Sequence, residues 1–280
     1  MNTVNSLSGG KTSSFIAVHY PADYEVFALC CIDCHNAGRS IDAKMKQRVN
    51  DRLQKYCSHQ NEFVATSEDP KILKVIFDLE QMIGREIIWL RGIGWEEMIR
   101  YKSAIPNMSK RFCTTFLKLQ PIFEYCYKYL ELPVKMRIGY RADEPERRET
   151  FSNSFEFAYK CEQQSTRWIQ RWMELVWRVG DFPLIDDNIF HYAIQRFWED
   201  KGIDFPLDSN CLNCFWKHPQ QLRKNFDTDN AIMQWSKIME DMAGHTFKDK
   251  MSLAQIENEG IQLDFIFGTG SGCQAGFCTD

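Results

Sequence analysis

Residues 2–13 read NTVNSLSGGKTS, and the rest of the architecture can be worked out from this stretch. Positions 2–7 have the length and side chains of a short strand, and a helical pattern begins at residue 13. Between them, Gly9 and Gly10 permit a tight turn that brings main-chain N–H groups close to an anion. The helix that follows directs the positive end of its dipole toward the same point. This order of elements predicts a phosphate-binding loop.

Six consecutive residues of this loop are candidate ligands of a nucleotide's phosphate groups: Ser8, Gly9, Gly10, Lys11, Thr12 and Ser13. The glycines offer N–H groups, Lys11 offers a positive charge, and the hydroxyl groups offer further donors. The loop is not a Walker A motif, because the Gly-x₄-Gly-Lys spacing is absent. A glycine turn in front of an ordinary helix is the competing interpretation.

Candidate strands and helices alternate through the first 140 residues. Strands are expected at 2–7, 24–32, 62–66 and 134–140, with 87–90 either a strand or a turn. Helices are expected at 13–20, 42–57, 70–83, 95–101 and 114–130, the last with a break caused by Pro121. This alternation predicts an α/β fold with a doubly wound, mostly parallel, Rossmann-like sheet.

The pattern changes after residue 150. We divide the chain into a nucleotide-binding α/β core (1–150), an aromatic-rich insertion or hairpin (151–186), a helical part (187–267) and a tail rich in glycine and cysteine (268–280). The helical part is expected to contain helices at 187–201, capped by Asp187, and at 231–242. The fold is thus predicted as a Rossmann-like core with a C-terminal helical extension that contains cysteines.

Ligands of such sheets bind at the carboxyl ends of the strands. Segments 8–13, 33–39 and 139–148 should therefore meet at one edge of the sheet. Asp33, Asn36 and Gly38 would then border the nucleoside half of the pocket. Turn formation alone explains Asp33 and Asn36 equally well.

The bulk properties indicate a cytoplasmic protein. No apolar run approaches the roughly 20 residues needed to cross a bilayer, and the N-terminus lacks the pattern of a signal peptide. The formal net charge is −4 and the isoelectric point is about 5.9. This charge neither implies nor excludes nucleic acid as a partner, because basic residues still gather at 137–148 and 217–224.

The chain contains eleven cysteines, which is many for a protein of a reducing compartment. Cys211 and Cys214 have the C-x-x-C spacing of metal ligands and need partners. Cys273 and Cys278 in the tail are candidates. Four cysteines in apolar stretches are interpreted as buried residues without a chemical role: Cys30, Cys31, Cys57 and Cys126. The role of Cys34 stays open.

Several segments together resemble a known family. SGGKTS is similar to the PP-loop of adenine-nucleotide α-hydrolases. Three further segments resemble motifs of the phosphoadenosine phosphosulfate reductase-like branch: RFCTTFLKLQP at 111–121, IGYRADEPER at 138–147, and SNCLNCFWK at 209–217, the last typical of phage and prophage members. Trp235 and Glu240 lie in a W-x₃-M-E segment downstream. The matches run in order from residue 6 to about 245.

The resemblance implies a HUP-type fold that binds ATP and adenylates a substrate, with Mg²⁺ and release of pyrophosphate. By position in the motifs, it implies that Gly139 and four charged residues face the phosphates, the metal or the substrate: Arg141, Asp143, Glu144 and Arg147. With Lys11, the first three of these four are the candidate catalytic residues. Thr12 stands where many PP-loops have Asp, which moves a magnesium role to Asp143 or Glu144. A loop salt-bridge group with Arg147 and Arg148 is the competing interpretation.

The resemblance also adds Cys113 to the candidate metal ligands, because relatives with an iron–sulfur cluster use a cysteine near this segment. Those relatives have adjacent cysteines there, whereas residue 112 is Phe. Cys113, Cys211 and Cys214 would hold a [4Fe–4S] cluster with one open iron. Cys211 and Cys214 with the two tail cysteines would hold structural Zn²⁺. A site without metal is the third alternative.

Three functions follow as hypotheses. The first is an ATP pyrophosphatase-type enzyme that adenylates a substrate for sulfur transfer to a nucleotide or nucleic acid, with a sulfur donor protein as partner. The second is a sulfonucleotide reductase in which a thiolate of Cys273 or Cys278 attacks an adenylyl sulfate, with thioredoxin as reductant. The third is a nucleotide-binding adaptor without turnover.

Overall fold

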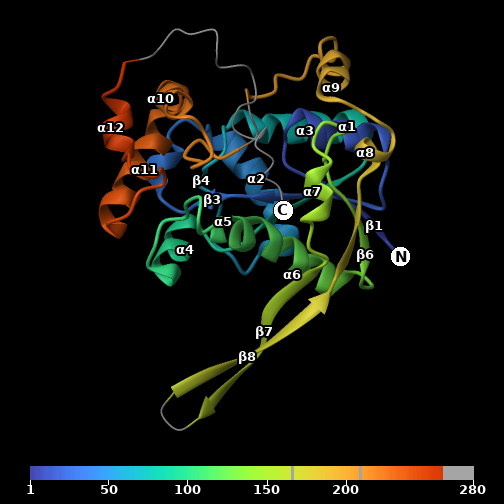
Figure 1. The fold of residues 1–280 in the computed structure, drawn as a ribbon, viewed down its shortest axis with the longest axis horizontal. Coiled ribbons are helices and arrows are strands. Elements are labelled where there is room, and N and C mark those ends of the chain that lie inside the picture. Colours follow the sequence, from blue (N-terminus) through green and yellow to red (C-terminus); the bar gives the residue numbers. More distant parts are fainter. Residues whose placement is uncertain (165–166, 208–209, 261–280) are drawn as a thin grey trace.

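A five-stranded parallel sheet forms the centre of the protein (Figure 1). The structure is a computed structural model and describes residues 1–164, 167–207 and 210–260. The strand order is β5 (Ile87–Arg91), β2 (Tyr24–Leu29), β1 (Thr3–Leu7), β6 (Val134–Arg137) and β9 (Arg178–Asp181). The chain thus moves outward from β1 to β5 and then restarts on the other side with β6. This confirms the prediction of an α/β fold with a parallel sheet, and it places the topological switch point between β1 and β6.

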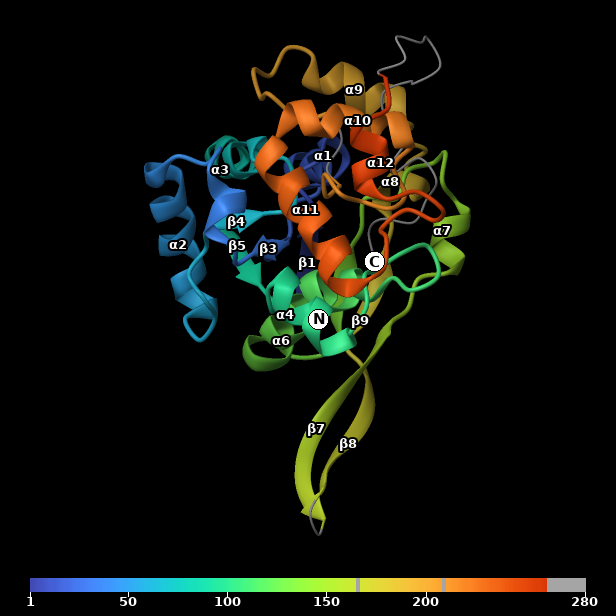
Figure 2. The same ribbon diagram turned by 90° about the vertical axis from the view of Figure 1, so that its left-hand side faces the viewer.

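Helices cover both faces of the sheet, as the nearly continuous apolar strands require (Figure 2). One face packs against α1 (Lys11–His19), α3 (Lys71–Ile83) and α9 (His191–Trp198), and α2 (Ala43–Cys57) adds to the same core. The other face packs against α6 (Gln120–Tyr129). The predicted start of α2 is confirmed, because the Asp42 carboxylate accepts a hydrogen bond from the Met45 N–H at 2.9 Å.

The apolar run at 24–32 does not form a single strand. It leaves the sheet at Cys30, whose N–H donates to Glu68 Oε2 at 3.3 Å and whose carbonyl accepts from the Ser67 N–H at 3.0 Å. After this residue, β3 (Cys31–Ile32) pairs antiparallel with β4 (Ala65–Thr66). The expectation of a third sheet strand at 62–66 is therefore wrong, and β5 takes that place beside β2.

The predicted interruption near Pro121 is confirmed. A short α5 (Phe112–Thr114) is followed by a π-helical turn (Thr115–Leu119) before α6 begins. Pro121 lacks an N–H group and is placed in the first turn of α6, where that group has no helical partner in any case. The π-helical turn lets the chain change helical register in front of the proline.

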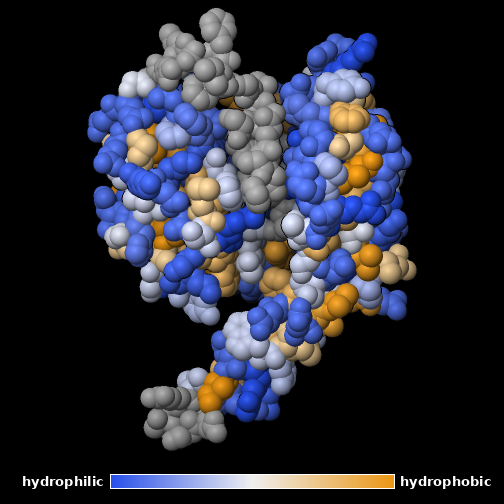
Figure 3. All heavy atoms as spheres, viewed as in Figure 1, coloured by the Kyte–Doolittle hydropathy of each residue, from blue (hydrophilic) through white to orange (hydrophobic). Residues whose placement is uncertain are grey.

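A long hairpin projects from the body of the protein (Figures 1 and 2). Its strands are β7 (Ser154–Gln164) and β8 (Arg167–Val176), which confirms the hairpin expected in this region. Phe155 stacks on Phe123 of α6 with ring centroids 4.7 Å apart, and this contact fixes the base. Farther out, Trp168 is 68% exposed, and Figure 3 shows hydrophobic patches along the projection.

Strand β9 corrects the boundary expected at residue 150. Arg178 pairs with Val134, so the end of the 151–186 segment belongs to the central sheet. A short α8 (Pro183–Asp186) follows, and α9 begins at His191 rather than at 187. Asp187 does not cap this helix, because its carboxylate accepts a hydrogen bond from the Tyr20 hydroxyl at 2.5 Å.

A second core lies beyond the carboxyl end of β2, where three C-terminal helices pack on α4 (Trp95–Lys102) and on a 3₁₀ turn (His35–Gly38). These helices are α10 (Pro219–Thr228), α11 (Asn230–Ala243) and α12 (Leu253–Glu257). The predicted helix at 231–242 is confirmed as α11. The tail at 268–280 lies outside the described residues. Within the described part of the chain, no helix combines the length and apolarity that a membrane crossing requires.

Candidate functional site

The loop between β1 and α1 has the backbone of an anion-binding turn. Gly9 has φ +72°, and a Cβ atom built on it would lie 2.8 Å from Ile72 Cγ2, so both conformation and packing require glycine here. Gly10 is the N-cap of α1, and no side chain caps this end among the described residues. Lys11 is exposed. The first N–H groups of α1 therefore lie beside a lysine at the surface.

Ser13 stabilises the loop from inside rather than lying at its surface. Its hydroxyl accepts a hydrogen bond from the Ser8 N–H at 3.1 Å and donates to the Gly10 carbonyl at 3.2 Å. The residue is 5% exposed. Thr12 is half-buried, whereas Lys11 points outward. The predicted ligands thus divide into Ser13, which shapes the turn, and Lys11 and Thr12, which are accessible.

The loops after β1 and β6 meet at the switch point, as expected from the strand order. A Cβ atom on Gly139 would lie 3.2 Å from Thr12 Cγ2 and 3.5 Å from the Ser13 nitrogen. Glycine at this position allows the two main chains to approach each other closely. The loop at 139–148 therefore borders the glycine turn directly, and its charged residues lie next to the candidate phosphate site.

Glu144 is neutralised by two arginines. Its carboxylate lies 3.0 Å from Arg141 Nη2 and 3.4 Å from Arg147 Nη1, and all three side chains are buried. The Arg147 guanidinium also covers the ring of Tyr140 at 4.0 Å. A carboxylate enclosed in this way maintains the shape of the loop. Arg148 is not part of the group, because it pairs with Asp186 at 2.9 Å.

Asp143 is the more accessible carboxylate of the pair. Its side chain is 38% exposed and lies 3.3 Å from Arg141 Nε. One oxygen also accepts a hydrogen bond from the His191 N–H at 3.2 Å. Asp143 therefore points to the surface next to Arg141, whereas Glu144 points inward.

Two residues of α9 that were not predicted from the sequence lie near the glycine turn. Trp198 Nε1 donates to the Lys11 carbonyl at 2.9 Å. His191 Nε2 lies 2.8 Å from Gln195 Nε2, and its buried Nδ1 has no hydrogen-bond partner among the described residues. Burial lowers the pKa of His191, and the positive charges of Arg141 and Lys11 lower it further. The aromatic pattern of α9 was visible in the sequence, but its orientation was not.

Asp33 and Gly38 have structural roles near the end of β3. Asp33 accepts hydrogen bonds from Arg91 Nη2 at 2.7 Å and from Asn61 Nδ2 at 3.1 Å. A Cβ atom on Gly38 would lie 2.1 Å from the Val64 carbonyl oxygen, so only glycine fits there. Asn36 is exposed. Their expected contact with a nucleoside stays a prediction.

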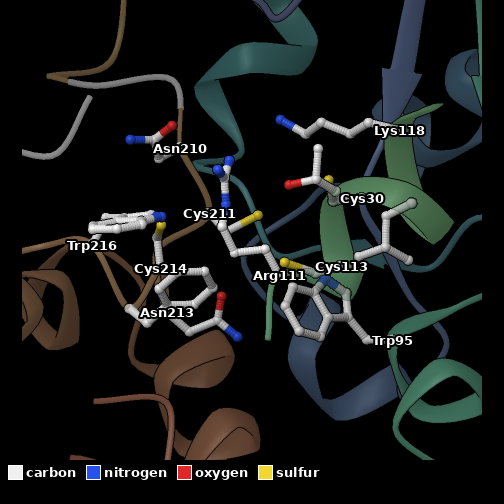
Figure 4. A pocket seen from close by; sticks show the side chains of 13 residues that line it. Cys30, Trp95, Arg111, Cys113, Lys118, Asn210, Cys211, Asn213, Cys214 and Trp216 are labelled. Carbon is white, nitrogen blue, oxygen red and sulfur yellow. The ribbon is translucent and has the colours of Figure 1, made fainter. Parts of the chain in front are cut away.

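Four cysteines line a cavity of about 50 Å³ on the side of the second core (Figure 4). Cys113 comes from α5, and Cys211 and Cys214 come from the C-x-x-C turn, so the structure brings together three predicted metal ligands. Cys30 is the fourth, although it was interpreted as a buried strand residue without a chemical role. It is 1% exposed, but its side chain reaches the cavity wall.

Hydrogen bonds hold the C-x-x-C turn against the β3–β4 pair. The Cys214 N–H donates to the Cys211 carbonyl at 3.0 Å, which closes the turn. The Leu212 N–H donates to the Ser67 carbonyl at 2.6 Å, and the Ser67 hydroxyl donates to Cys211 Sγ at 3.0 Å. Because Ser67 also binds the Cys30 carbonyl, one residue connects both sides of the cavity.

The thiols influence one another electrostatically. The hydrogen bond with Cys211, together with burial, raises the pKa of Cys30 well above the usual thiol range. Burial raises the pKa of Cys113 to about 12, and the neighbouring Cys211 and Cys214 contribute to this increase. Lys118, which lies 3.5 Å from Glu68, counteracts the shifts of both thiols. A metal ion would reverse this situation, because it binds thiolates and releases their protons.

The thiols surround the cavity without already meeting at one point. Across residues 1–164, 167–207 and 210–260, no three His, Cys, Asp or Glu side chains form a ready-made metal site. Cys273 and Cys278, the ligands expected for structural zinc, lie outside the described residues. Comparisons with protein-family models, curated proteins and solved structures found no match.

Proposed function

We propose that this chain is a PP-loop enzyme that binds ATP through residues 8–13 and transfers the adenylyl group to a substrate. The observation that carries the proposal is the contact between the glycine turn after β1 and the charged loop after β6, at the switch point of a parallel sheet. Gly139 borders Thr12 there, and Lys11, Arg141 and His191 lie around the same place. Three nitrogen-bearing side chains beside free helix N–H groups suit a polyphosphate.

Charge neutralisation and positioning are what adenylyl transfer needs from a protein. Lys11 would stabilise the negative charge that develops on the phosphates. Arg141 is held by Glu144 and Asp143, so its guanidinium is oriented before the nucleotide arrives. Burial and the positive charges of Arg141 and Lys11 lower the pKa of His191, which favours the neutral ring in the free protein, and its Nδ1 atom has no hydrogen-bond partner among the described residues.

Magnesium would bind to Asp143 in this arrangement. The carboxylate is exposed at the rim, whereas Glu144 is already neutralised by two arginines. Mg²⁺ held by this carboxylate would supply positive charge that offsets the charge of the phosphates. The thiol cavity suits the second cofactor, a thiophilic metal centre.

Binding and turnover can be tested separately. Calorimetric titration with ATP and Mg²⁺ should give saturable heat, and Lys11→Ala should weaken the affinity roughly 10- to 100-fold, because a charge-assisted contact contributes about 1.5–3 kcal/mol. Lys44→Ala is the matched control, since Lys44 is exposed on α2. Incubation with α-labelled ATP and a panel of nucleotide and nucleic-acid substrates should yield AMP and pyrophosphate.

Absence of binding heat with magnesium present would overturn the proposal. Tight binding without any AMP or pyrophosphate across the panel would favour the adaptor hypothesis instead. The reductase hypothesis depends on Cys273 and Cys278, outside the described residues, and it would require sulfite release from an adenylyl sulfate.

A further inference from the structure

Cys30 lies at the one point where β2 leaves the sheet and turns toward the second core. Its main-chain N–H and carbonyl are bound to Glu68 and Ser67, so the side chain is held in one direction. The thiol is hydrogen-bonded to Cys211 and lines the same cavity as Cys113 and Cys214 (Figure 4). A residue that resembled ordinary strand core in the sequence is therefore part of a group of four thiols.

We propose that Cys30 is the fourth thiolate ligand of a metal centre whose other ligands are Cys113, Cys211 and Cys214. The inference extends the metal part of the proposed function. It differs from the arrangement expected from the sequence, in which three cysteines leave one iron open or the tail cysteines complete a zinc site. With Cys30 included, the site is complete without the tail and has no open position for substrate.

The surroundings of the cavity fit a buried anionic centre. Four thiolates carry four negative charges, which exceed the two positive charges of Zn²⁺ or of an oxidised [4Fe–4S] core. Lys118 and Arg111 line the same cavity and offset the excess. The Asn213 side chain is fully buried, and neither its oxygen nor its nitrogen has a hydrogen-bond partner in the described part of the chain. An amide N–H next to metal-bound sulfur would be satisfied by that sulfur.

The two metals share the thiolate chemistry and differ in geometry. In a tetrahedral zinc site, with Zn–S about 2.3 Å, neighbouring sulfur atoms are about 3.8 Å apart, so all four must converge. Cys30 and Cys211 are already hydrogen-bonded neighbours. An iron–sulfur cluster holds its thiolates farther apart, around a central body, which resembles the way the four thiols surround the cavity. In either case each thiol releases its proton to solvent when the metal binds.

Cys31 provides a matched control. It is adjacent to Cys30 and equally buried, but it packs in the core on the opposite side, with Phe27 and Ile76. Burial raises the pKa of Cys31 to about 12, so it is also a protonated thiol in the absence of metal. Cys31→Ser therefore introduces the same atom exchange at the same depth without touching the cavity.

The experiment compares full-length wild type, Cys30→Ser and Cys31→Ser, all purified without oxygen. Iron, sulfide and zinc are measured per chain, and the visible spectrum distinguishes an iron–sulfur cluster from colourless zinc. We expect one centre per chain in the wild type and in Cys31→Ser, and at least a tenfold loss of metal affinity in Cys30→Ser. Full metal content with unchanged affinity in Cys30→Ser would overturn the inference, and so would equal losses in both variants.

The wild type alone decides the question if Cys30→Ser does not fold. Anaerobic Co²⁺ titration of the metal-free wild type reports ligation through the sulfur-to-cobalt charge-transfer absorption. If the wild type holds zinc, the intensity of this absorption should correspond to four thiolates, and an intensity of three or fewer would contradict the inference. If the wild type holds a cluster, ready exchange of a single iron would contradict the inference, because a cluster with four cysteine ligands has no open iron. Calorimetry with ATP on the same samples keeps the two proposals apart. If Cys30→Ser loses metal and still binds ATP, the result bears on the metal site alone. If the metal-loaded wild type does not bind ATP, the result contradicts the proposed function and leaves the metal site untouched.

Discussion

The indole N–H of Trp198 donates a hydrogen bond to the main-chain carbonyl of Lys11 at 2.9 Å, although 187 residues separate them in the chain. Trp198 is 4% exposed and belongs to the core that also contains α1. The first residue of α1 is thus held from outside by α9. The position of Lys11 in the glycine turn therefore depends on a helix that lies far along the sequence.

Trp198→Phe should weaken ATP binding while the fold persists. The substitution removes one hydrogen bond worth about 1 kcal/mol and keeps most of the ring, so we expect an affinity about fivefold lower by calorimetry. Trp89→Phe is the control, because the buried Trp89 nitrogen has no hydrogen-bond partner among the described residues. An equal effect of both variants on ATP affinity would show that the Lys11 contact has no role.

Gly9→Ala should destabilise the protein more than Gly84→Ala. Both glycines have positive φ, +72° and +63°, so alanine strains both by about 1–2 kcal/mol. At Gly84 the new Cβ would meet nothing within 4 Å, whereas at Gly9 it would lie 2.8 Å from Ile72 Cγ2. Overpacking adds about 1–3 kcal/mol at Gly9 only.

Denaturant unfolding measures this difference, and ATP calorimetry measures its consequence for the loop. Gly84→Ala should bind ATP like the wild type, since the residue ends α3 at a distance from the loop. Equal unfolding free energies for the two variants would mean that Ile72 moves aside at no cost.

ATP binding should take up a proton on His191. Burial and the nearby positive charge of Arg141 hold its pKa below 6.5 in the free protein, and bound phosphates raise it again. Protons are therefore taken up at a pH between the two pKa values, and ATP affinity increases as the pH falls through this range. At a pH above both pKa values the ring is neutral in both states and the effect vanishes.

Calorimetry in two buffers of different ionisation enthalpy measures the uptake near pH 6. His191→Gln should remove the part of the uptake that exceeds the titration of ATP itself. His19→Gln should not, although burial also lowers the pKa of His19, because this residue lies in the last turn of α1. Identical proton uptake in wild type and His191→Gln would place His191 outside the nucleotide site.

The outer part of the β7–β8 hairpin should be dispensable for folding. Ala158 and Trp172 form a cross-strand pair, so an Asn-Gly turn can replace residues 159–171. We expect the free energy of unfolding to change by less than about 0.5 kcal/mol, because the removed side chains Tyr159 and Trp168 are 56% and 68% exposed. Phe155→Ala, which removes the stack on Phe123, should cost about 1–2 kcal/mol. A large loss of stability in the shortened protein would contradict this assignment.

The sequence predicted elements whose signal is local. The glycine turn, the helix at 42–57, the proline break and the hairpin all depend on a few neighbouring residues, and all were found. Strand β9 was missed because four residues, RVGD, carry no strand pattern of their own, and its pairing with β6 is a long-range interaction. The cap expected at Asp187 was wrong for the same reason, since Tyr20 is a distant partner.

The thiol group was predicted only in part. C-x-x-C spacing identified Cys211 and Cys214, and the resemblance added Cys113. Cys30 was hidden, because Cys30 and Cys31 look alike in an apolar run. What separates them is the point at which β2 leaves the sheet, and this depends on hydrogen bonds from Ser67 and Glu68.

Strand β2 joins the two regions on which the proposals depend. Leu7 at the end of β1 is paired with Phe27, so Ser8 and Cys30 leave the sheet from adjacent strands at the same edge. With about 3.3 Å per residue and 4.8 Å between strands, their Cα atoms are on the order of 10 Å apart. The glycine turn and the group of four thiols are therefore held at a separation that two paired strands fix, with no hinge between them.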